Sequence, residues 1–279
     1  ESLIEEFSIE LVGVEIIDPK SPKQKSKREE FGDLLWEKRK RKGLTKFEAS
    51  KLMRERNYFG SMMVEQGEAD ALISGITRNY PSTIKPALEV IGKRDEVKNV
   101  LGMYIMNTKK GTLFLADTTI NVNPTEDEIV EITELVSKAI KSLKFIPRIA
   151  LLSYSNFGSS RTPESRKMSN AAKRLNKLYP NMIIDGEIQA DFALNKEKMK
   201  YLFDFSTLSE KSANTLIFPN LESGNIAYKL IQELEGTDSI GPILVGMKKP
   251  VHILQLGSSV REIVNMITLA VVDAQITTK

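Results

Sequence analysis

Apolar and polar positions alternate along this chain in a pattern that predicts strands separated by helices. Short apolar runs rich in β-branched residues are typical of strands, and they occur at 11–17, 69–73, 148–153, 182–185, 215–218 and 240–245. Two more apolar runs, 100–106 and 112–116, are joined by the turn-forming segment 107–111. This spacing predicts a β-hairpin.

Amphipathic stretches between these runs predict helices. They occur at 31–41, 45–56, 58–66, 82–91, 124–143, 162–178, 224–234 and 260–274. Thr45 followed by Glu48 has the spacing of a capping box, and Asn123-Pro124 with Glu126 is a typical helix start. Strands that alternate with helices indicate an α/β fold, with a mostly parallel sheet covered by helices on both faces.

Composition narrows the classes of function. The 279 residues are 41% hydrophobic and carry a net charge of only +3, with one histidine and no cysteine. The lack of cysteine excludes disulfides, thiolate catalysis and zinc–thiolate sites, and it is compatible with a reducing cytoplasm. Neither a nucleic-acid partner nor a membrane partner is expected, because the charge is nearly balanced and no apolar run is long enough for a bilayer.

Polar, glycine-bearing loops follow several of the predicted strands. In open α/β sheets, ligands collect beyond the carboxyl ends of the strands, and backbone N–H groups with hydroxyls suit an anion. Each loop alone is also explained as a turn with a helix cap, but several together favour a polar binding site. The candidate ligand-binding residues on these loops and the helices that follow are Ser74, Gly75, Arg78, Thr83, Ser153, Ser155, Asn220 and Asn225.

Four other features have a structural and a functional interpretation. The basic run 38–42 is either a helix end favoured by the helix dipole or an attraction for a polyphosphate. His252 lies between apolar residues and is expected in the core. Asp117 and Asp185 follow strands, where carboxylates often cap turns, and no ligand cluster around either predicts a metal site.

The loops in order resemble the phosphate acetyltransferase and butyryltransferase family. The matching stretches are DALISG (70–75), TIKP (83–86), LAD (115–117), LLSYS (151–155), IDGEIQ (184–189), IFPNL (217–221), GNIAYK (224–229), GP (241–242) and KP (249–250). They cover nearly the whole chain. Each stretch is weak alone, but the ordered set is specific.

The resemblance implies a two-lobed, three-layer αβα fold like that of isocitrate and isopropylmalate dehydrogenases, with mostly parallel sheets and a cleft between the lobes. It places residues 1–93 and 251–279 in the first lobe and 94–250 in the second, through which the family dimerises. Family members begin with a strand and a helix that we do not find before Glu1, so we expect the first lobe to be incomplete here.

The catalytic positions of the family are changed in this sequence. The family enzymes transfer acetyl between phosphate and coenzyme A, with a serine as oxyanion donor, an arginine for phosphate and an aspartate as base. These positions match Gln255, Leu256 and Glu262. A second arginine matches Lys85, which keeps the charge but loses the bidentate geometry, and a third is retained as Arg39.

We therefore expect no catalytic residue here, and add Arg39, Lys85 and Gln255 to the ligand-binding set. The segment 252–266 resembles the end of hybrid NADP-dependent malic enzymes, in which a transacetylase-like domain makes the enzyme responsive to acetyl-CoA. By this resemblance the chain is a non-catalytic acetyl-CoA-binding domain. It needs no cofactor, whereas NADP and a divalent metal belong to a separate malic enzyme domain. The alternatives are an active phosphate acetyltransferase and an assembly module whose only role is dimerisation.

Overall fold

The computed structural model describes residues 2–236 and 239–277. The chain divides into two compact units, Glu1–Met63 and Val64–Lys279, and each is described by itself. The first unit is helical. Its elements are α1 (Ser2–Glu6), η1 (Pro22–Gln24), α2 (Lys25–Arg39), η2 (Lys40–Lys42), α3 (Lys46–Leu52) and most of α4 (Arg56–Glu65).

The strand predicted at 11–17 is wrong, because the structure has no strand there. Leu11, Val12, Val14 and Ile16 are all exposed. A strand is stabilised by pairing and by burial of one face, and β-branched composition alone provides neither. The capping box at Thr45 is confirmed: Glu48 N donates to Thr45 Oγ1 at 3.2 Å, and Thr45 N donates to Glu48 Oε2 at 2.9 Å.

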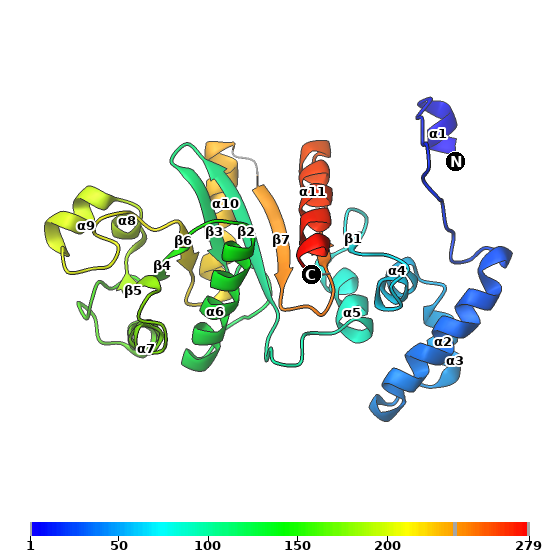
Figure 1. The fold of residues 1–279 in the computed structure, drawn as a ribbon, viewed down its shortest axis with the longest axis horizontal. Helices are drawn as coiled ribbons and strands as arrows, with labels where there is room; N and C mark the ends of the chain where they lie inside the picture. Colours follow the sequence, from blue (N-terminus) through cyan, green and yellow to red (C-terminus); the bar gives the residue numbers. More distant parts are fainter. Residues whose placement is uncertain (1, 237–238, 278–279) are drawn as a thin grey trace. The chain divides into compact units, whose positions relative to one another are not determined.

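The second unit is built on one eight-stranded sheet with the order β1-β8-β7-β2-β3-β6-β4-β5 (Figure 1). The pairs β1–β8, β3–β6, β6–β4 and β4–β5 are parallel, whereas β2 is antiparallel to β3 and β7, and β7 to β8. The strands are β1 (Leu72–Ser74), β2 (Leu101–Thr108), β3 (Gly111–Ala116), β4 (Arg148–Leu152), β5 (Ile183–Ile188), β6 (Thr215–Ile217), β7 (Ser239–Val245) and β8 (Val251–Ile253).

This sheet confirms the α/β class, the mostly parallel pairing and the hairpin. Strands that the family resemblance places in two different lobes belong to one continuous sheet, since β7 pairs with β8 at Ile243 and His252. Strand β8 is not among the predicted strands, since the sequence indicates only that His252 lies in the core. The lobe boundaries at 93/94 and 250/251 stay a prediction.

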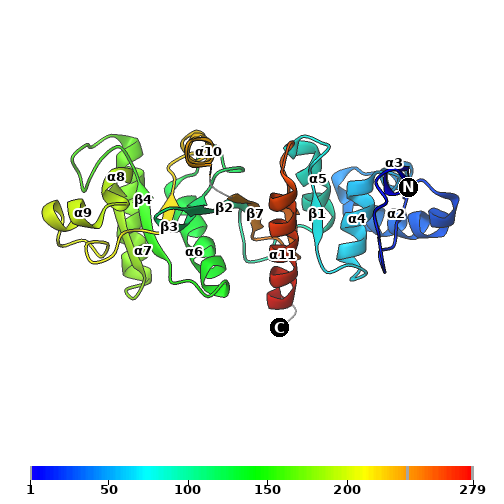
Figure 2. The ribbon, with the colours of Figure 1, turned by 90° about the horizontal axis from the view of Figure 1, so that it is seen from above.

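Helices lie on both faces of the sheet (Figure 2). On one face lie α6 (Glu126–Ser142), α7 (Pro163–Leu178) and α11 (Val260–Thr277). On the other lie α5 (Tyr80–Val90), α8 (Ala190–Ala193), α9 (Lys196–Leu202) and α10 (Leu221–Glu235). Successive side chains of β2 point to opposite faces of the sheet. Leu101, Met103 and Ile105 belong to the core on the side of α6 and α7. Tyr104 and Met106 belong to the other core, which includes Tyr228 of α10.

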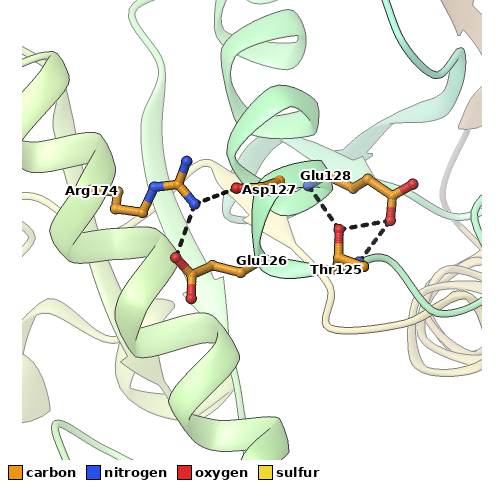
Figure 3. A network of polar contacts seen from close by, with 5 residues as sticks. All are labelled: Thr125, Glu126, Asp127, Glu128 and Arg174. Carbon is orange, nitrogen blue, oxygen red and sulfur yellow. Dashed lines mark hydrogen bonds and ion pairs between the residues drawn. The ribbon is translucent and has the colours of Figure 1, made fainter.

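The start of α6 shows how charges join two helices of one layer (Figure 3). Thr125 and Glu128 form a capping box, with Glu128 N donating to Thr125 Oγ1 at 3.3 Å. Arg174 on α7 donates from Nη1 to Glu126 Oε1 at 2.9 Å and to Asp127 Oδ1 at 2.5 Å. The carboxylates thus interact favourably with the helix dipole and also bind the neighbouring helix.

Across residues 2–236 and 239–277, no helix combines the length and apolar character needed to span a membrane.

Candidate functional site

Gln255 lies directly after β8, and its side chain is bound to two buried tyrosines. Its Nε2 donates to the hydroxyl of Tyr228 at 2.7 Å and also to the hydroxyl of Tyr104. A carboxamide has two N–H donors, so both are used within the protein. The backbone N–H of Gln255 donates to Ser258 Oγ at 3.2 Å. Gln255 is therefore fixed from both its side chain and its backbone.

Glu262 and Leu256 lie in the same segment but play different parts. Glu262 N donates to Ser259 Oγ at 3.2 Å, and Ser259 N donates to Glu262 Oε2 at 2.8 Å, which makes a capping box at the start of α11. Its other oxygen, Oε1, accepts from Gln232 Nε2 at 3.1 Å. Leu256 is 64% exposed. An apolar residue so exposed contributes little to the core.

These three changed positions line one cavity of about 90 Å³. Its other walls come from β2, α10, β7 and α11, and the residues are Tyr104, Gln232, Ser239, Gly241, Leu254, Gly257, Ser258 and Met266. The structure therefore brings together the positions that the family resemblance singles out. Apart from Glu262, none of the lining residues carries a charge.

Gly75 positions the segment that carries Gln255. It has a φ of +127°, and a Cβ placed on it would lie 2.0 Å from the carbonyl oxygen of Leu254. Leu254 N donates to Ser74 O at 2.7 Å, continuing the pairing of β1 with β8. Only glycine allows this conformation and this close approach. Gly75 thus acts through backbone packing, and Ser74 through its backbone carbonyl.

The loop after β1 leads into α5, where the candidate residues differ in exposure. Asn79 caps the helix by accepting from Ser82 N at 3.1 Å. Thr83 is buried, and its hydroxyl donates to Asn79 O at 3.1 Å. Lys85 and Arg78 are exposed on the same segment. Their roles as ligand-binding residues stay predictions, and so does that of Arg39, which ends α2 in the first unit.

Ser153 and Ser155 belong to a loop that is tied to β5. Ser155 is fully buried, and its hydroxyl donates to Glu187 Oε1 at 2.9 Å. Gly158 N donates to the same oxygen at 2.7 Å. Ser153 Oγ accepts from Ser155 N at 3.2 Å. These hydroxyls therefore take part in the architecture of the loop, which sequence reasoning explained equally well as a set of turns.

Asn220 and Asn225 both join α10 to its surroundings. Asn220 is the N-cap, and its Oδ1 accepts from Ser223 N at 2.9 Å. Asn225 Nδ2 donates to Thr118 O at 3.1 Å, across to the loop after β3. Through these contacts the two residues set the position of α10, and with it Tyr228, one helical turn after Asn225.

Three tyrosines were missed by the sequence analysis, and two of them, Tyr104 and Tyr228, contact Gln255. The rings of Tyr104 and Tyr228 stack with centroids 4.1 Å apart, and Tyr80 has a buried hydroxyl with no hydrogen-bond partner. Burial raises the pKa of Tyr104, and it raises the pKa of Tyr80, to which Asp117 adds. The hydroxyls of Tyr80 and Tyr104 therefore stay protonated. A tyrosine inside an otherwise apolar strand was the available signal, since a buried phenol needs a polar partner.

Two further candidates, Asp117 and His252, make contacts within the protein. Asp117 Oδ1 accepts from Gly102 N at 3.0 Å and from Thr119 N at 2.9 Å, so it caps a turn as expected. His252 is fully buried, as expected, with Nε2 3.3 Å from Asp273 Oδ2. Within the described part of the chain, no group of three or more His, Cys, Asp or Glu residues is arranged to hold a metal.

Comparisons with known proteins place this site in a family. The model of the family described as phosphate acetyl/butaryl transferase matches residues 1–271. The phosphate acetyltransferase of Clostridium acetobutylicum is 34% identical over 277 residues, which are 97% of this chain and 82% of that protein. The NADP-dependent malic enzyme of Escherichia coli is 40% identical over 239 residues, which are 85% of this chain but only 31% of that protein.

A solved structure agrees with these matches. A phosphotransacetylase from Streptococcus pyogenes superimposes with a TM-score of 0.85 at 33% identity, covering 100% of this chain and 83% of that one. The family match extends over far more than half of the sequence, and the structure carries the same fold. This chain belongs to the phosphate acetyl/butaryl transferase family.

Proposed function

We propose that this chain is a phosphate acyltransferase, which exchanges an acetyl group between coenzyme A and inorganic phosphate. The observation that carries the proposal is the similarity to phosphotransacetylases over nearly the whole chain, in both sequence and fold. Of the two functions that the sequence predicts, this is the alternative. The comparisons favour it, because the malic enzymes are matched over only about a third of their length.

The proposed reaction joins the CoA thiol to the acetyl carbon of acetyl phosphate, releases phosphate, and moves the thiol proton to a base. Glu262 is the carboxylate that lines the cavity and is therefore the base in this proposal. It gains that role only when its bonds to Ser259 and Gln232 are exchanged for the substrate. The phosphate is held by cations outside the cavity, for which Arg78 and Lys85 are the candidates.

One observation favours a second function, that of an acetyl-CoA-binding regulatory domain without turnover. Both amide hydrogens of Gln255 are donated to tyrosines, and both oxygens of Glu262 accept hydrogen bonds within the protein. An oxyanion donor and a base must be available to the substrate. In this second proposal acetyl-CoA is an effector, the chain forms a homodimer in the cytoplasm, and NADP and a divalent metal act in a separate malic enzyme domain.

A coupled assay with acetyl phosphate and CoA separates the two. Formation of the acetyl-CoA thioester at about 1 per second or faster, an ordinary enzymatic rate, supports the acyltransferase. Calorimetric titration with acetyl-CoA completes the test. Heat of binding without turnover overturns the acyltransferase in favour of the regulatory domain, and neither heat nor turnover overturns both.

A further inference from the structure

A second cavity lies at the opposite end of β7 and α11 from the cavity beside Gln255. It measures about 410 Å³ and is lined mainly by the end of β7, the segment 246–250 and the second halves of α6 and α11. The Gln255 cavity instead uses the start of β7 and the first half of α11, and the two cavities share no lining residue. We name the second one the α6–α11 cavity, after two helices that lie on the same face of the sheet (Figure 2).

The floor of the α6–α11 cavity is apolar. Met103 and Val245 line it, and both belong to the hydrophobic core on this side of the sheet. Ala139 of α6 and Leu269 of α11 also line it and are only partly buried against that core. Apolar surface is stabilised when another apolar group removes it from water. The floor therefore favours a ligand with an apolar body.

Four cationic side chains and one carboxylate line the same cavity. The cations are Arg94, Lys138, Lys248 and Lys249, and the carboxylate is Asp273. Most sites for small molecules combine an apolar lining with a few polar groups that fix the orientation of the ligand. Here those groups are predominantly positive, so they favour an anionic head group.

Part of this positive charge is already compensated within the protein. Lys248 Nζ lies 2.8 Å from Asp95 Oδ1, and Arg94 Nε lies 3.3 Å from Glu96 Oε1. In the part of the chain that the structure describes, neither Lys138 nor Lys249 pairs with a carboxylate. These two ammonium groups are therefore the ones available to an anion.

The one carboxylate of the cavity has a partner of its own. Asp273 Oδ2 lies 3.3 Å from Nε2 of His252. His252 is fully buried and does not line the cavity. The contact of Asp273 with this ring leaves the two lysines without a competing acidic partner inside the cavity.

We infer that the α6–α11 cavity binds an organic anion with an apolar body. The head group, a carboxylate, sulfonate or phosphate, lies at Lys138 and Lys249, and the body covers the floor. An inorganic anion would leave the floor in water, and a neutral apolar compound would leave both ammonium groups without a partner. A ligand with both parts uses both halves of the cavity. This site is separate from the one proposed for acyl transfer and does not depend on that function.

Fluorescence titration with two related probes tests the inference. The first, 8-anilinonaphthalene-1-sulfonate, has an apolar aromatic body and a sulfonate, whereas the second, N-phenyl-1-naphthylamine, has the same body without the charge. An exposed ion pair changes affinity by roughly 1.5- to 5-fold. With two lysines, the wild type should bind the sulfonate roughly 2- to 25-fold more tightly than the neutral probe.

Variants locate the binding at this cavity. Lys138→Gln combined with Lys249→Gln should remove the preference for the sulfonate and leave the affinity for the neutral probe unchanged. The matched control combines Lys141→Gln with Lys177→Gln, which removes two exposed lysines of α6 and α7 that do not line the cavity, and should bind as the wild type does. Ala139→Phe, which fills part of the floor, should weaken the binding of both probes.

Three results would overturn the inference. Equal affinity of the wild type for the two probes, or an unchanged preference in the Lys138→Gln and Lys249→Gln double variant, would mean that the cations do not hold the head group. Displacement of the sulfonate by inorganic phosphate at equal concentration would mean that charge alone is recognised. Competitive displacement by acetyl-CoA would mean that the probe occupies the proposed CoA site. Both lysines are exposed, so their replacement decides the matter even where Ala139→Phe does not fold.

Discussion

The side-chain amide of Gln255 donates a hydrogen bond to the hydroxyl of Tyr228, with 2.7 Å between Nε2 and Oη. The same nitrogen donates to Tyr104, so one side chain satisfies two buried phenols. Removing a partner from a buried polar group costs about 1–3 kcal/mol. Gln255→Ala should therefore lower the free energy of unfolding by about that amount, as measured by urea denaturation.

A double-mutant cycle with Tyr228→Phe controls this prediction. Tyr228→Phe removes the hydroxyl to which Gln255 donates. The effects of the two substitutions on the free energy of unfolding should therefore be non-additive by about 0.5–1.5 kcal/mol. Additive effects would mean that the contact contributes nothing to stability.

Glu262 has a structural and a proposed catalytic role, and glutamine separates them. In a capping box, glutamine serves as well as glutamate at the third helical position. Glu262→Gln should therefore change the free energy of unfolding by less than about 0.5 kcal/mol, whereas Glu262→Ala should lower it by about 1 kcal/mol. If Glu262 is the base, Glu262→Gln should lower the rate of acyl transfer by about 100-fold or more. An unchanged rate would remove Glu262 from the mechanism.

The buried carboxyl of Asp185 should make the free energy of unfolding depend on pH. Burial raises the pKa of this carboxyl, against the effect of its bonds from Ser206 Oγ at 2.8 Å and Gly186 N at 2.9 Å. A raised folded pKa means that the folded state holds the proton more tightly. The contribution of Asp185 to stability is thus present below its unfolded pKa, about 3.9, and is lost as the pH rises through the folded value.

Asp185→Asn is the matched variant for this pH effect. Asparagine keeps the size and an accepting oxygen but cannot ionise. Urea denaturation at several pH values from about 4 to 7 should show a loss of unfolding free energy with rising pH in the wild type that is smaller in Asp185→Asn. If the unfolding free energy changed with pH in parallel for the two proteins, Asp185 would not be the source of the pH dependence.

The sequence was sufficient for the fold wherever a pattern is local. The hairpin around 107–111 and the helix opened by Thr45 follow from spacing and caps. The helix predicted from 124 begins at Glu126, after the cap Thr125. The strand at 11–17 failed because pairing is not local. β8 was not predicted, and it is identified as a strand by its pairing with β1 and β7.

The site was predictable only in part, for a related reason. Family resemblance brought Gln255, Leu256 and Glu262 to attention, and the structure places them on one cavity. It could not reveal that Tyr104, more than 100 residues earlier in the chain, would occupy the donors of Gln255. Several hydroxyls chosen as ligands, such as that of Thr83, satisfy the backbone instead, which sequence alone cannot distinguish from binding.

We expect Lys85 to contribute to the affinity for acetyl-CoA. It is exposed in the middle of α5, and in the proposed function its ammonium meets an anionic part of CoA. Losing a charged hydrogen bond costs about 1–3 kcal/mol, so Lys85→Ala should weaken acetyl-CoA binding by roughly 5- to 150-fold. Calorimetry measures this directly. The matched control is Lys141→Ala, which removes another exposed lysine, on α6, and should bind as the wild type does.

Leu256 offers the sharpest test of whether this site has lost or kept acyl transfer. The family resemblance places an arginine at this position, and the leucine is 64% exposed, so a long polar side chain can replace it without disturbing the core. A charge-assisted bond to phosphate contributes about 1.5–3 kcal/mol. Leu256→Arg should therefore raise kcat/KM for acetyl phosphate by roughly 10- to 150-fold with an unchanged thermal midpoint.

Lysine at the same position separates charge from geometry. Leu256→Lys supplies the charge without the two-pronged guanidinium, so it should give a smaller rise than Leu256→Arg. Equal rises would mean that only the local potential matters. No rise with either cation, in a protein that still binds acetyl-CoA, would mean that phosphate does not approach Leu256. Because neither substitution replaces Gln255, whose amide hydrogens are donated to two tyrosines, that result would favour the regulatory domain over the acyltransferase.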